Sequence, residues 1–105
     1  MEPEPKRMND AEISAAVAQL DGRQVVDGML SREYEFSDFV EAIGFMMRVS
    51  IWAQTINHHP EWSNIYNLVR VGLRTHDVDG ISDYDVRLAA KMNELADRWR
   101  TASNG

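Results

Sequence analysis

Apolar and polar residues follow two different periods along the first third of the chain. Asn9 and Glu12 have the spacing of a capping box, and the apolar residues that follow at helical spacing are Ile13, Ala16, Val17 and Leu20. An Asp27-Gly28 pair then separates two β-capable runs within residues 24–36, which is a strong local signal for a tight turn. The pattern predicts a short first helix followed by a β-hairpin.

The middle of the chain predicts one long helix, from Asp38 to about Thr55. Asp38 and Glu41 again have capping-box spacing. The apolar positions of this segment are Phe39, Val40, Ile43, Phe45, Met46, Met47, Val49 and Ile51. They cover most of the helix circumference, and a helix that is apolar on more than one side needs two burial surfaces. One side is therefore a candidate contact for a subunit partner.

From Ser63 the pattern changes to a period of two, which is typical of a strand, and Asn67 is a turn residue that divides this region into a second hairpin. One face of the later strand holds Val69, Val71, Leu73 and Thr75, and the other holds Arg70, Gly72, Arg74 and His76. After a loop over residues 77–80, Ser82 and Asp85 mark the start of a last helix. Its apolar stripe is Leu88, Met92, Leu95 and Trp99.

These elements predict an α+β fold, with a four-stranded antiparallel sheet and three helices packed on one face. The 105 residues suit a single domain. We expect that domain to span residues 9–100, between a disordered tail at residues 1–8 and a polar tail at residues 101–105.

Composition excludes several classes of protein. The chain has no cysteine, so disulfides and thiolate chemistry are excluded. No apolar run approaches the length of a membrane span, and a cytoplasmic protein is the default expectation. The formal charge of −6 disfavours direct binding to nucleic acid, because a phosphate backbone is held by clustered lysine and arginine.

Candidate chemistry is concentrated in the run Asn57-His58-His59-Pro60-Glu61-Trp62. Neighbouring side chains on a continuous strand point to opposite faces, whereas a turn restricted by a proline can bring both histidines to one ligand. A third histidine, His76, ends the later strand. Three converging imidazoles could donate and accept protons near neutral pH. A solvated pair in a turn and a metal site of three histidines are the alternatives.

The segment from Gln54 to Asp85 resembles the signature of the pterin-4a-carbinolamine dehydratase family, also called dimerization cofactor of homeodomain transcription factors. The positions that match this signature without a gap are His58, His59, Pro60, Tyr66, His76 and Asp85. The resemblance continues upstream through residues 32–39 and 44–46, so it covers nearly all of residues 10–100.

This resemblance implies a fold, an oligomer and a reaction. Family members pair through their sheets into homodimers and often form homotetramers through the long helix. They dehydrate a pterin substrate, 4a-hydroxytetrahydropterin, to quinonoid dihydropterin, in pterin recycling after an aromatic amino-acid hydroxylase, and they use no metal or other cofactor. By this analogy His58 and His76 are the acid/base pair and His59 orients the pterin ring. Asn57, Pro60 and Trp62 are candidate substrate-binding residues, although Pro60 also shapes the turn and Trp62 also suits a core.

Two further candidate substrate-binding residues depart from the family pattern. Gln54 stands where the family usually has glutamate, and Arg23 stands where many members have a tryptophan that lines the pterin pocket. A nearby carboxylate favours a protonated imidazole and a guanidinium disfavours it, so both changes predict more neutral histidines. Arg23 could instead stack on the planar pterin.

The departures suggest the alternative of a weakened dehydratase that serves as a protein-binding or assembly factor. Relatives provide precedents for it, as partners of homeodomain transcription factors and as Rubisco assembly factors of carboxysomes. In that alternative the partner is a protein, and the pterin site is a remnant.

Overall fold

In the computed structural model of the protein, residues 4–104 are described, with side chains as far as Asp97. The elements, in order along the chain, are α1 (Asp10–Gln19), β1 (Gln24–Val26), β2 (Met29–Glu35), α2 (Phe39–Thr55), β3 (Glu61–Ile65), β4 (Leu68–Leu73), the 3-10 turn η1 (His76–Val78) and α3 (Asp83–Asn104).

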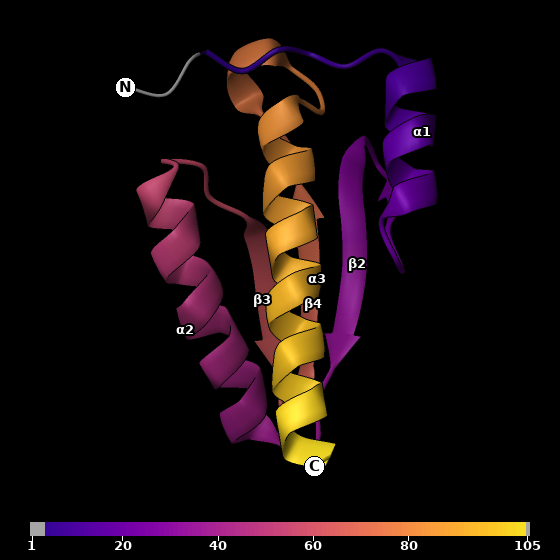
Figure 1. Cartoon of the computed structure of the whole chain (residues 1–105). Helices are drawn as coiled ribbons and strands as arrows, with labels where there is room; N and C mark the ends of the chain where they lie inside the picture. Colours follow the sequence, from indigo (N-terminus) through magenta and orange to yellow (C-terminus); the bar gives the residue numbers. More distant parts are fainter. Residues whose placement is uncertain (1–3, 105) are drawn as a thin grey trace.

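The four strands form one antiparallel sheet in the order β1-β2-β4-β3. Two hairpins are therefore joined side by side through β2 and β4, and β1 and β3 are the edges. Figure 1 shows α3 crossing the middle of the sheet, with α2 beside it on the β3 side and α1 on the β2 side. The predicted α+β fold with three helices and a four-stranded sheet is confirmed.

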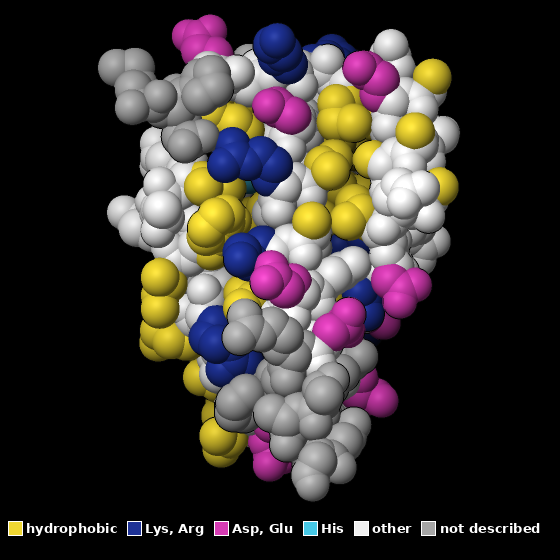
Figure 2. Space-filling model, in the orientation of Figure 1, with side chains coloured by type: hydrophobic (Ala, Val, Ile, Leu, Met, Phe, Trp, Pro, Cys, Tyr) yellow, Lys and Arg dark blue, Asp and Glu magenta, His cyan; other side chains and the backbone are white. Residues whose placement is uncertain are grey.

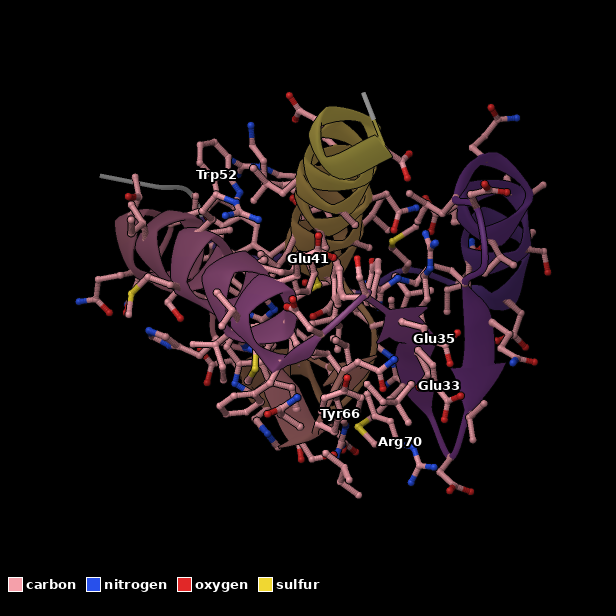
Figure 3. The ribbon with its side chains drawn as sticks, turned by 90° about the horizontal axis from the view of Figure 1, so that it is seen from below. Glu33, Glu35, Glu41, Trp52, Tyr66 and Arg70 are labelled. Carbon is pink, nitrogen blue, oxygen red and sulfur yellow. The ribbon has the colours of Figure 1, made fainter. Side chains whose placement is uncertain are left out.

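The core lies between this sheet and the helices. Val69, Val71 and Leu73 point into it from β4, as the period of two predicted. A stripe on α2 meets them, made of Ala42, Phe45, Val49 and Ala53. The ring of Phe45 lies 4.8 Å from that of Tyr34 and 5.0 Å from that of Phe36, between centroids, at the tilted angles that aromatic pairs prefer. On the other face of the sheet, Glu33 pairs with Arg70, away from the helices (Figure 3).

The helix starts follow the local signals in the sequence. Asn9 and Glu12 form the full capping box, since each side chain accepts a hydrogen bond of 2.8 Å from the other residue's backbone N–H. Asp38 caps α2 by accepting from the N–H of Glu41, but the Glu41 carboxylate binds the N–H and hydroxyl of Ser37 instead. The capping box of α2 is therefore only half formed.

The chain ends differ from the predicted tails. The N–H of Lys6 donates to Asp83 Oδ1 and the N–H of Met8 donates to the carbonyl of Ile81, while the Met8 side chain packs on the core. Charged residues and prolines favour disorder locally, but the loop before α3 offers this segment backbone partners. At the other end, residues 101–104 continue α3 instead of forming a tail. Residues 1–3, residue 105 and the side chain of Trp99 lie outside what the structure describes.

A buried polar network joins the start of β1 to β2 and α3. Arg23 donates to the Tyr34 hydroxyl at 2.8 Å and to the Leu30 carbonyl at 3.1 Å. The Tyr34 hydroxyl donates in turn to Asn93 Oδ1 at 2.5 Å, and Arg32 donates to the same oxygen at 2.7 Å. Burial lowers the pKa of Arg23 and raises the pKa of Tyr34 above its ordinary value of 10.0.

Tyr34→Phe should lower the free energy of unfolding by about 1–3 kcal/mol at pH 7, because Arg23 and Asn93 lose a buried partner. It should also change the pH dependence. The unfolded wild-type chain releases the phenol proton near pH 10 while the folded chain retains it, so wild-type stability falls as the pH rises above about 10. The variant should lose this fall. Urea unfolding from pH 7 to pH 11 measures both effects.

Tyr66→Phe is the matched control, because Tyr66 is exposed at the β3–β4 turn. It should leave stability and its pH dependence unchanged. If wild type and Tyr34→Phe lost the same free energy of unfolding between pH 7 and pH 11, the result would contradict this account of the network.

Candidate active site

The end of α2 sets the direction of the two adjacent histidines. The backbone N–H of Asn57 bonds the carbonyl of Gln54, and that of His58 bonds the carbonyl of Ala53. Asn57 itself has φ of 54°, in the left-handed region that commonly ends helices and that asparagine tolerates better than most residues. The chain thus leaves α2 abruptly, and His58 and His59 lie in the short segment before β3.

His58 is held by a buried carboxylate. Its Nε2 lies 2.5 Å from Oδ1 of Asp85, whose side chain is fully buried while that of His58 is 11% exposed. The other oxygen of Asp85 accepts from the Thr75 hydroxyl at 2.8 Å and from the backbone N–H of Ser82 at 2.9 Å. The Tyr84 ring lies edge-on to the imidazole, 6.0 Å between centroids. His58 therefore has one fixed orientation.

The other two histidines are more open. His59 Nε2 lies 3.1 Å from the amide oxygen of Gln54, one turn back on α2. His76 begins η1 and is 73% exposed, with its Nε2 3.6 Å from a carboxylate oxygen of Glu61, the first residue of β3. Solvent screens this last pair, so it orients His76 only weakly.

These contacts bring the candidate residues of four segments to one end of the sheet. The end of α2 supplies Gln54, Asn57 and both adjacent histidines, and the start of β3 supplies Glu61. Thr75, which directly precedes His76, and Asp85 at the start of α3 complete the group. Pro60, half-buried, joins the histidines to β3. The cluster can orient imidazoles around a small polar ligand.

Arg23 and Trp62 lie elsewhere. Arg23 is in the core, where its guanidinium donates to Tyr34 and Leu30 of β2 and contacts Met92 of α3. Trp62 is half-buried in β3, opposite Val71, and packs against the core. It also borders a groove of about 680 Å³ on the open face of the sheet. None of the histidines lines that groove, although Glu61 reaches both places.

Sequence reasoning did not predict the contacts that join Asp85 to His58, Thr75 and Ser82. The local sequence predicts Asp85 as a residue at the start of the last helix, and it does lie in the first turn of α3. The available signal was its position in the family signature, but a separation of 27 residues from His58 does not reveal a contact. The carboxylate that contacts His58 belongs to Asp85, whereas the Gln54 side chain contacts His59.

Among residues 4–97, no group of three or more histidine, aspartate or glutamate side chains is arranged to hold a metal ion. No helix within residues 4–104 combines the length and apolar character needed to cross a membrane.

Comparison with known proteins identifies the family. A family model described as pterin 4 alpha carbinolamine dehydratase matches residues 6–95. The chain belongs to this family.

Its similarity to individual members of the pterin carbinolamine dehydratase family extends over most of the domain. A relative from Solibacter usitatus, named for this dehydratase, is 44% identical over 90 residues, which cover 86% of this chain and 95% of that protein. A relative of the same name from Ruegeria pomeroyi is 54% identical over 78 residues, covering 74% of this chain and 76% of that protein.

A solved structure from Brucella melitensis, described as a transcriptional coactivator/pterin dehydratase, is also similar. It superposes with a TM-score of 0.85 at 41% sequence identity, covering 87% of this chain and 99% of that chain. The structural similarity and the family model therefore give the same family for this chain.

Asn57→Ala should lower the free energy of unfolding by about 1–2 kcal/mol, because alanine is strained in the left-handed conformation. Asn57→Gly should cost less, since glycine adopts that conformation without steric penalty. Urea unfolding of the two variants measures the difference. Equal losses would show that the turn before His58 does not depend on this backbone conformation.

Proposed function

We propose that this protein dehydrates a 4a-hydroxytetrahydropterin to the quinonoid dihydropterin. The observation that carries the proposal is the arrangement of the signature histidines at one end of the sheet, with His58 held by the buried carboxylate of Asp85. Membership of the dehydratase family supports the choice of substrate class.

The reaction needs one proton to be given and another to be taken. The C4a–O bond breaks and the hydroxyl leaves as water after receiving a proton. The N5–H bond gives up its proton, and its electron pair becomes the C4a=N5 double bond. Imidazoles suit both transfers, because they can donate and accept protons near neutral pH.

His58 and His76 are the proposed acid/base pair. His59 is proposed to hold and orient the pterin ring, together with Gln54, Asn57 and Pro60. Trp62 is left out of this group, because it packs against the core on β3. Arg23 is left out of the proposed site, because its guanidinium lies in the core and is engaged by Tyr34.

The direct test is turnover of freshly generated 4a-hydroxytetrahydropterin, followed against the spontaneous reaction. Wild type should accelerate dehydration. His58→Ala and His76→Ala should each lower kcat by about 10²- to 10⁴-fold, the usual contribution of a general acid or base. Gln54→Glu should change kcat much less, because Asp85 already provides a carboxylate to His58.

Tyr66→Phe serves as the control variant in the same assay and should retain wild-type kcat. A wild-type rate no faster than the spontaneous reaction would refute the proposed activity. Such a result, with partial activity in Gln54→Glu, would point to a site that no longer catalyses the reaction.

A second candidate function, protein binding through α2, rests on one specific observation. The side of α2 opposite its buried stripe exposes four apolar residues at helical spacing, namely Val40, Ile43, Met47 and Ile51. Met47 is 62% exposed and Ile51 is 65% exposed. Figure 2 shows hydrophobic side chains following this outer edge of the molecule. An apolar stripe of this kind typically marks a protein contact.

We propose that this stripe pairs with the same stripe of another copy in a homodimer or homotetramer. An isologous contact between helices buries equivalent residues on both copies. A different protein partner is the alternative occupant, and the description of the Brucella melitensis relative as a transcriptional coactivator favours testing it.

Met47→Glu should dissociate the contact between α2 helices, because the charge would be buried in it. A tetramer should become a dimer, or a dimer should become a monomer. Sedimentation velocity measures the change. Ala90→Glu is the control, since Ala90 is exposed on α3, and it should leave the oligomer intact. Unchanged assembly in Met47→Glu would contradict pairing through α2.

A further inference from the structure

The hydrogen bonds around Asp85 have a determined direction. Ser82 contributes its backbone N–H to Asp85 Oδ2, and the Thr75 hydroxyl donates to the same oxygen. The Thr75 oxygen also lies 2.6 Å from the Ser82 hydroxyl. Each hydroxyl has one hydrogen, so Ser82 must donate to Thr75. The Ser82 oxygen accepts from the backbone N–H of Tyr84 at 3.2 Å.

All of these donors therefore point toward a carboxylate that only accepts. Asp85 is fully buried, and a buried charge of this kind needs every available donor. Its Oδ2 is occupied by Thr75 and Ser82, which leaves Oδ1 for His58. An ionised carboxylate cannot donate, so the proton in this contact must reside on Nε2 of His58.

We infer that Asp85 is a positioning residue that holds His58 as the Nε2–H tautomer, so that Nδ1 is the nitrogen that takes the pterin N5 proton. Among the described residues, Nδ1 makes no hydrogen bond of its own. Proton transfer to Nδ1 forms an imidazolium, and the Asp85 carboxylate stabilises that charge. Thr75 and Ser82 do not contact His58 through these bonds; they hold the Asp85 carboxylate in its orientation.

The other histidines lack this arrangement. His59 meets the neutral amide of Gln54, and both side chains are exposed. His76 meets the Glu61 carboxylate only at 3.6 Å, and both groups are largely exposed. A carboxylate held in the protein interior therefore distinguishes His58 and assigns it the role of base. The departure at Gln54 leaves this role intact.

The catalytic part of this inference rests on the proposed function, whereas the tautomer assignment does not. Nitrogen-15 NMR of the histidine rings tests the tautomer directly. Wild-type His58 should show a protonated Nε2 and an unprotonated Nδ1 at a pH where the ring is neutral. A ring protonated on Nδ1 would overturn the inference.

Asp85→Asn should reverse the tautomer. Thr75 and the Ser82 N–H would still donate to the amide oxygen, so the amide NH₂ would face His58 and donate to Nε2. The proton would then move to Nδ1, and that nitrogen could no longer accept. A His58 tautomer unchanged from wild type would also overturn the inference.

In the turnover assay, Asp85→Asn should lower kcat by about 10²-fold or more, with a smaller change in KM. Asp83→Asn is the matched control in the same helical turn. Asp83 accepts a surface hydrogen bond from the backbone N–H of Lys6, and its variant should keep wild-type kcat. Wild-type kcat in Asp85→Asn, with a wild type that turns over, would refute the inference and leave the proposed function standing.

The Thr75 variants keep the test decisive if Asp85→Asn fails to fold. Thr75→Val removes the hydroxyl from Asp85, and Thr75→Ser retains it. Thr75→Val should give a mixture of the two His58 tautomers and a lower kcat. Thr75→Ser should show the wild-type tautomer and the wild-type kcat. If wild type shows no turnover, the proposed function fails, and the NMR result alone decides the role of Asp85.

Discussion

The burial of one carboxylate constrains the whole functional end of this protein. Asp85 lies in the core, where an unpaired charge would cost several kcal/mol, about 3–5 when one partner of a buried pair is removed. Its donors come from three places in the chain, the segment after α2, the end of β4 and the start of α3. The carboxylate is satisfied only when these three segments meet. The contacts that satisfy this buried charge are therefore the same contacts that assemble this end of the site.

Arg23 and Gln54 lie apart from this buried carboxylate. Arg23 occupies a second buried polar network, centred on Tyr34, which lies further along α3 and is separate from the histidines. The side chain of Gln54 contacts the exposed His59. Arg23 and Gln54 thus contact groups other than the His58–Asp85 pair. The proposed enzyme activity and the proposed protein contact of α2 are compatible, because the candidate site lies at the end of the helix and the exposed apolar stripe runs along its length.

Sequence reasoning succeeded where the determinant is local. Capping residues, the Asp27-Gly28 turn and the two hydrophobic periods each act within a few residues, so they predicted the helices, the hairpins and the inward face of β4. It was less successful at the chain ends. Residues 6–8 and 101–104 have polar local sequences, but the first segment finds backbone partners before α3 and the second extends that helix.

By itself the sequence determined the α+β fold, the family and the three histidines, because periodicity and motif spacing are properties of the linear chain. Only the tertiary structure decided which group holds each histidine. Asp85 follows His58 by 27 residues, and Arg23 meets α3 at Met92, 69 residues away. Contacts over such separations depend on how the sheet and helices pack. The same arginine could have lined a pocket or entered the core, and the packing of β2 against α3 placed it in the core.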